Sequence, residues 1–88
     1  MSAVLTALHR PVVASTLTDQ VALGIAGTLR AARVASSQKL APMTAGWHAG
    51  RCEALLDLLL PLVRSDDDMA AITSARARVR ALLMGEQS

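Results

Sequence analysis

The chain has 88 residues, which is enough for one small domain and not for several. Its nine Lys and Arg against seven Asp and Glu leave a formal net charge of +2, an excess too small to require a nucleic-acid partner. A single cysteine excludes an internal disulfide, and the longest apolar run, Leu58 to Val63, is far shorter than the roughly 20 residues that cross a bilayer. We therefore expect one helical domain, 1–88, in the cytoplasm.

The composition favours an all-α fold. Ala, Leu and Arg dominate, and no long run alternates between apolar and polar residues with a period of two. Trp47 is the only aromatic residue, so the core must consist of aliphatic side chains and many alanines. We predict a compact antiparallel bundle of three main helices, at about 16–35, 44–63 and 66–84. An N-terminal arm (1–14), helical or extended, precedes them, and a linker (36–43) follows the first helix.

The first predicted helix starts at a capping box formed by Thr16 and Asp19. One apolar face follows at spacings of three and four, at Leu17, Val21, Ile25, Leu29 and Ala32. Gly24 and Gly27 each cost a helix roughly 1 kcal/mol relative to Ala, a cost that is explained if another backbone comes close. The alternative is that glycine is merely tolerated at both positions.

The second predicted helix carries most of the rare residues of the chain, in the stretch "WHAGRCEALLDLLLPL" from Trp47 to Leu62. Thr44 is its predicted N-cap. Its polar residues form one narrow stripe, Gly50, Glu53, Asp57 and Arg64, so we expect this helix to be buried on most sides. Pro61 predicts a kink or an end in its last turn.

The third predicted helix begins at a second capping box, Ser65 and Asp68, and Gly85 ends it. It has a large apolar side and a separate side of small residues. The small residues recur at spacings of four, three and four, at Ala70, Ser74, Ala77 and Ala81, and we call this set the small-residue face. Small side chains let a second helix approach closely, so we predict a homodimer with this face as its interface. The dimer would form through the third helix, the second helix, or both.

Catalysis and metal binding find little support in the sequence. His48 and Cys52 lie four residues apart, but two ligands do not hold a structural zinc ion. Cys52 falls in mid-helix on an apolar flank, without the positive surroundings that activate a thiol. No phosphate-binding loop or nucleotide fingerprint is present. We expect no catalytic residue, no metal and no cofactor.

Arginines offer possible contacts to phosphates or to an acidic partner. Arg76 and Arg80 share a face of the third helix, and Arg30 and Arg33 could form a second patch. Arg78 points the other way, and aromatic residues that would stack on bases are missing. Arg76 lies at the edge of the apolar side, where three interpretations remain open: its stem reaches solvent, it pairs with Glu53 or Asp57, or it anchors an acidic partner.

Trp47, His48 and Arg51 are predicted to form a partner-binding surface, since Trp and Arg are enriched at binding hot spots and lie four residues apart here. The alternative is that Trp47 closes the end of the bundle.

We predict a non-enzymatic interaction protein that acts by stoichiometric binding to a protein partner. Small proteins of this kind often regulate or inhibit, including those of phages and other mobile elements. The alternative function is binding of nucleic acid or nucleotide phosphates through the arginines.

Overall fold

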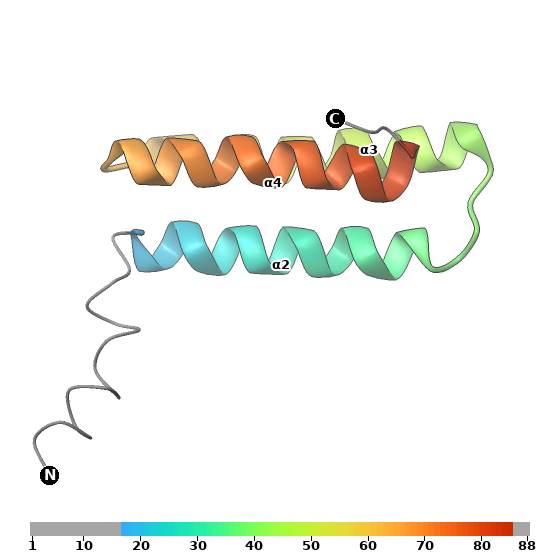
Figure 1. The fold of residues 1–88 in the computed structure, drawn as a ribbon, viewed down its shortest axis with the longest axis horizontal. Helices are drawn as coiled ribbons and strands as arrows, with labels where there is room; N and C mark the ends of the chain where they lie inside the picture. Colours follow the sequence, from blue (N-terminus) through green and yellow to red (C-terminus); the bar gives the residue numbers. More distant parts are fainter. Residues whose placement is uncertain (1–16, 86–88) are drawn as a thin grey trace, which may run out of the picture.

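A computed structural model describes residues 17–85, and every regular element within this range is a helix. The elements are α2 (Asp19–Ser36), α3 (Pro42–Asp57), the short 3₁₀ helix η1 (Leu60–Leu62) and α4 (Asp66–Met84). The three long helices all pack against one another (Figure 1). The prediction of an all-α bundle of three main helices is therefore confirmed. The predicted arm, 1–14, and the predicted cap Thr16 lie outside the described residues.

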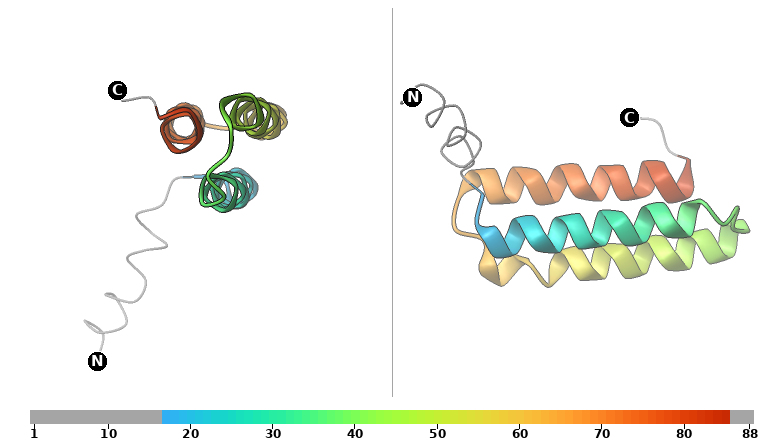
Figure 2. Two further views of the ribbon diagram at one scale, coloured as in Figure 1. Left: turned by 90° about the vertical axis from the view of Figure 1, so that its right-hand side faces the viewer. Right: turned by 90° about the horizontal axis from the view of Figure 1, so that it is seen from below.

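The helices lie side by side and form a triangle when the bundle is viewed from its end (Figure 2). The connection from α2 to α3 lies at one end of the bundle, and the connection from α3 through η1 to α4 lies at the other (Figure 1). Each pair of the long helices therefore shares one interface in the bundle.

Prolines set both limits of α3 and account for the difference from the predicted range of 44–63. The helix begins at Pro42, whose fixed φ and missing N–H suit the first position of a helix, so Thr44 is not its N-cap. It ends at Asp57, four residues before Pro61. A proline ring collides with the carbonyl four residues earlier, which explains why the α-helix stops there and the chain continues into η1.

Asp68 ties the starts of two helices together. Ser65 caps α4 by accepting a hydrogen bond from the Asp68 N–H (3.1 Å), as the predicted capping box requires. The Asp68 carboxylate is fully buried, and its hydrogen bonds extend beyond the capping box. Its Oδ1 accepts from the Thr18 N–H (2.9 Å), and its Oδ2 accepts from the Thr18 hydroxyl (2.6 Å) and the Arg64 N–H (2.8 Å). These bonds, the Thr18 hydroxyl above all, lower the pKa of Asp68.

The core is narrow and built largely from small residues. Val21, Leu56 and Val79 are fully buried, one from each long helix, and alanines fill much of the remaining contact. Such side chains allow the helices to pack closely. The prediction that α3 is buried on most sides is wrong, because several of its large apolar residues and those just after it are exposed, namely Met43, Trp47, Leu55, Leu58 and Leu60.

The two glycines of α2 have different surroundings. A Cβ placed on Gly24 would lie 2.9 Å from Cδ1 of Leu59 and closer still to its Cδ2, so a side chain of the neighbouring segment occupies the space. Nothing lies within 4 Å of the corresponding position at Gly27. The close approach that we predicted exists at Gly24 only, and it is made by a side chain rather than by a backbone.

Candidate partner-binding groove

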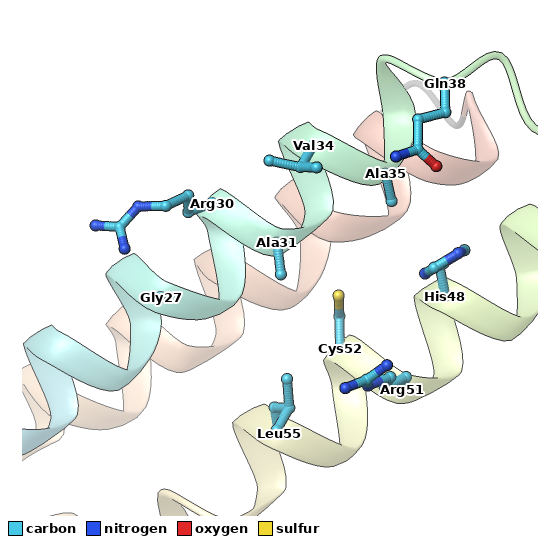
Figure 3. A pocket seen from close by; sticks show the side chains of 10 residues that line it. All are labelled: Gly27, Arg30, Ala31, Val34, Ala35, Gln38, His48, Arg51, Cys52 and Leu55. Carbon is cyan, nitrogen blue, oxygen red and sulfur yellow. The ribbon is translucent and has the colours of Figure 1, made fainter.

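A groove of about 390 Å³ runs between α2 and α3, and we refer to it as the α2–α3 groove (Figure 3). Its side along α2 is formed by Gly27, Arg30, Ala31, Val34, Ala35 and Gln38. Its side along α3 is formed by His48, Arg51, Cys52 and Leu55. Cys52, Leu55 and His48 point from α3 toward α2, whereas Arg30 and Val34 lie along the outer edge of α2 (Figure 3).

Two exposed leucines extend the groove toward the other end of the bundle. Leu23 precedes Gly27, Arg30 and Val34 at the helical spacing of four, three and four, and its side chain is 73% exposed. Leu58 follows His48, Arg51 and Leu55 at three, four and three, and is 71% exposed. Gly24 and Leu59, their neighbours in sequence, are in contact. The α2–α3 groove thus continues an apolar surface that none of the residues 17–85 covers.

The groove carries positive charge from both helices. Arg30 comes from α2 and Arg51 from α3, and none of the ten lining residues is acidic. The acidic residues of α3 face α4 instead, where they are engaged by arginines. An apolar floor with permanent positive charges at its edges is suited to a ligand that is apolar and acidic at once.

Trp47 lies beside this groove, with its indole 60% exposed. Its ring meets the His48 ring edge to face, with centroids 4.9 Å apart, and Cζ of Arg51 lies 5.6 Å from the ring centroid. The structure therefore brings Trp47, His48 and Arg51 together as predicted, by contacts within one helix. The alternative that Trp47 closes the end of the bundle is wrong, because more than half of its surface faces solvent.

Cys52 forms part of the groove floor and is 4% exposed. Burial raises the pKa of its thiol, and the nearby charge of Arg51 opposes this effect only partly. The thiol is therefore protonated at neutral pH, which is the state of a packing residue rather than of a nucleophile. Within residues 17–85, no three His, Cys, Asp or Glu side chains come close enough to hold a metal ion.

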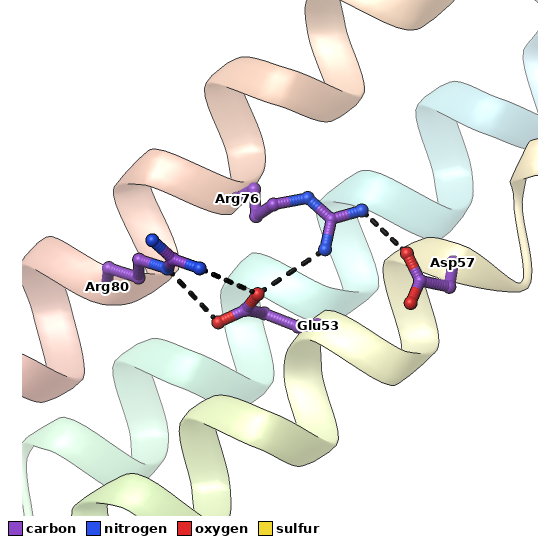
Figure 4. Close-up of polar contacts among 4 residues, drawn as sticks. All are labelled: Glu53, Asp57, Arg76 and Arg80. Carbon is purple, nitrogen blue, oxygen red and sulfur yellow. Dashed lines mark hydrogen bonds and ion pairs between the residues drawn. The ribbon is translucent and has the colours of Figure 1, made fainter.

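Arg76 and Arg80 pair with α3 across a different groove (Figure 4). Arg76 donates to Asp57 (2.6 Å) and Glu53 (3.4 Å), and Arg80 donates to both carboxylate oxygens of Glu53 (3.2 and 3.3 Å). These bonds, that from Arg80 most of all, lower the pKa of Glu53, and the bond to Asp57 does most to raise the pKa of Arg76. Of the three interpretations of Arg76, the structure shows the ion pair.

The four arginines proposed for phosphate or acidic contacts do not form one surface. Arg76 and Arg80 are occupied by carboxylates on the side between α3 and α4, whereas Arg30 lies in the α2–α3 groove and Arg33 is exposed outside it. Arg30 instead joins Arg51 and His48, which sequence reasoning placed in a separate surface. Helical periodicity relates positions within one helix only, so the meeting of Arg30 with Arg51 had no signal in the sequence.

The small-residue face of α4 is not covered by any part of the chain that the structure describes. Ala70, Ser74, Ala77 and Ala81 are all exposed, on the outer surface of the helix that packs its other side onto α2 and α3. Their exposure fits the predicted dimer interface, which stays a prediction.

Comparison with protein-family models, with curated protein sequences and with solved structures found no match for this chain. Among the described helices, none combines the length and the apolar character that crossing a membrane requires.

Proposed function

We propose that the protein is a non-enzymatic interaction protein that binds one segment of a protein partner in the α2–α3 groove. The observation that carries this proposal is the groove itself: it joins Arg30 from α2 with His48 and Arg51 from α3 around an apolar floor. Binding of this kind is stoichiometric, and it regulates or inhibits the partner by occupying the captured segment.

Surface residues beside the groove suit recognition of a protein. Trp47 presents an exposed aromatic ring held by His48 and Arg51, and side chains of these types supply much of the energy at protein interfaces. Large apolar side chains left in contact with solvent mark interaction sites when they gather in one place. Leu23, Leu55 and Leu58 gather along this groove.

Nucleic acid is the weaker candidate for the partner. A phosphate backbone needs several uncompensated cations in a row. Arg76 forms ion pairs with Glu53 and Asp57, and Arg80 forms one with Glu53, so the charge of both arginines is partly neutralised within the bundle. Arg30 and Arg51 flank an apolar floor rather than a continuous basic track.

Affinity capture from the cells that make the protein tests the proposal with three variants. Arg51→Glu reverses a charge in the groove, Trp47→Ala removes the neighbouring ring, and Arg33→Glu reverses an exposed charge of α2 outside the groove. We expect wild type and Arg33→Glu to retain the same partner in equal amounts, and the other two variants to lose it while circular dichroism shows an intact helical fold. Equal capture by all four proteins would contradict the groove as binding site.

A further inference from the structure

We propose that the segment bound by the α2–α3 groove is an acidic amphipathic helix, which lies between α2 and α3 as a fourth helix of the bundle. Its apolar residues contact the exposed leucines and Val34, and its carboxylates meet Arg30 and Arg51. This inference rests on the proposed function, since it names the chemistry of the partner at the same groove. Three observations support it: the length of the groove, its charge, and the fact that a second copy of this chain offers no suitable acidic helix.

The length of the apolar surface matches a helix rather than a small molecule. Leu23 and Val34 are eleven positions apart on α2, which corresponds to about 16 Å at the rise of an α-helix. His48 and Leu58 span nearly the same distance along α3. A ligand that covers both ends must extend over about three helical turns, and the groove between two packed helices is the surface into which the side-chain ridge of another helix fits.

The charges of the groove select an acidic helix. Arg30 stands on the α2 edge of the groove and Arg51 on its α3 edge, so a helix that lay along the groove would have one guanidinium group on each side. No carboxylate of residues 17–85 lines the groove to neutralise them. A basic helix would be repelled by both guanidinium groups, whereas Asp or Glu flanking an apolar stripe would form charge-assisted hydrogen bonds with them.

A second copy of this chain does not supply such a helix. Two copies that met through this groove would bring Arg30 and Arg51 of one chain toward those of the other, because both lie near the middle of the groove. The acidic residues of the bundle are also unsuitable as a stripe. Glu53 and Asp57 are paired with α4, and Asp68 is buried. Asp19, Asp66 and Asp67 stand in first helical turns at one end. Residues 1–16 contain no Asp or Glu.

Trp47 provides the readout, since it is the only tryptophan and its ring contacts Arg51 and His48 of the groove. The probes are designed 18-residue helical peptides without Trp or Tyr. All share one Leu/Ala stripe. One has Glu on both sides of the stripe, a second has Lys at the same positions, and a third has the composition of the first but a central proline that breaks the helix. Titration at low salt, followed by tryptophan fluorescence, gives the dissociation constants.

We expect the Glu peptide to bind at least about tenfold more tightly than the Lys peptide and the proline peptide. The double variant Arg30→Glu, Arg51→Glu should reverse the preference between Glu and Lys, and the matched control Arg33→Glu should leave it unchanged. Addition of 1 M salt should weaken the Glu peptide most.

Several outcomes overturn the inference. Equal binding of Glu and Lys peptides removes the role of charge, and equal binding of the proline peptide removes the helix. If no peptide changes the fluorescence and none binds by calorimetry, the groove takes another ligand. The same conclusion follows if the protein binds anionic lipid vesicles but not the Glu peptide. These failures differ from failure of the proposed function: a partner lost specifically from Arg51→Glu in affinity capture would still show that the groove binds a protein.

Discussion

A single carboxylate, Asp68, fixes the relation between the start of α2 and the start of α4. It is fully buried, and it accepts three hydrogen bonds from Thr18 and Arg64, which lie outside its own helix. Buried carboxylates are costly unless such bonds satisfy them, and removing the acceptor leaves the donors unsatisfied. Asp68 therefore contributes more to the fold than its neighbours Asp66 and Asp67 in the same acidic run, which are exposed.

We predict that Asp68→Asn destabilises the bundle in a pH-dependent way. At pH 7 the amide presents an N–H₂ group to donors, and we expect the melting temperature to fall by about 5 °C or more. The pKa of Asp68 is lowered in the folded state, so its stabilising effect is complete above the ordinary carboxyl pKa of about 4 and is lost as pH falls below that value. The difference between wild type and Asp68→Asn should therefore shrink in acid. Thermal melts from pH 7 to pH 2 measure it.

Asp66→Asn is the matched control for that experiment. It makes the same change of charge in the first turn of α4, but Asp66 is exposed. We expect a small loss at pH 7 from the helix dipole alone. Equal losses for the two variants, or a gap that persists at pH 2, would show that the buried hydrogen bonds of Asp68 are not the cause.

Among the elements, α2 allows a direct comparison of two glycines within one helix. Gly27→Ala adds a methyl group in open space and removes the flexibility of glycine, so we predict a gain in the free energy of unfolding of about 1 kcal/mol. Gly24→Ala adds the same group against the buried side chain of Leu59. Overpacking of this kind costs about 1–3 kcal/mol, which cancels or exceeds the helix gain. Urea denaturation of both variants measures the difference, and equal gains would contradict the close packing at Gly24.

The sequence predicted the three helices because each has strong periodicity, and it placed Trp47, His48 and Arg51 together because they belong to one helix. It misplaced α3 because Thr44 resembles a cap while Pro42, two residues earlier, is the actual start. It also overestimated burial of α3, since its many leucines suggested a central helix. Periodicity shows which residues share a face, but not whether a neighbouring helix covers that face. The α2–α3 groove depends on that second fact and could not be predicted.

For the whole molecule, three surfaces of the bundle have different chemistry. Between α3 and α4, Arg76 and Arg80 form ion pairs with carboxylates. The α2–α3 groove is apolar and positively charged, and the outer side of α4 carries the small-residue face. A face of small residues and an apolar groove with two arginines suit different neighbours. The proposed partner helix and the predicted second copy of the chain would therefore occupy separate surfaces.

We predict that the protein dimerises through the small-residue face and that Ala77→Glu abolishes the dimer. Ala77 lies in the middle of the face and is exposed in the single chain, so a bulky charge there blocks the close helix approach without disturbing the core. Light scattering at high micromolar concentration should give twice the 9.2 kDa of one chain for wild type and one chain mass for the variant. Ala54→Glu, on an exposed position of α3, is the control and should remain dimeric. A wild-type monomer at that concentration would show that the small residues serve another purpose. A dimer formed through the small-residue face would leave the α2–α3 groove of each chain free, so that one dimer could bind two partner helices.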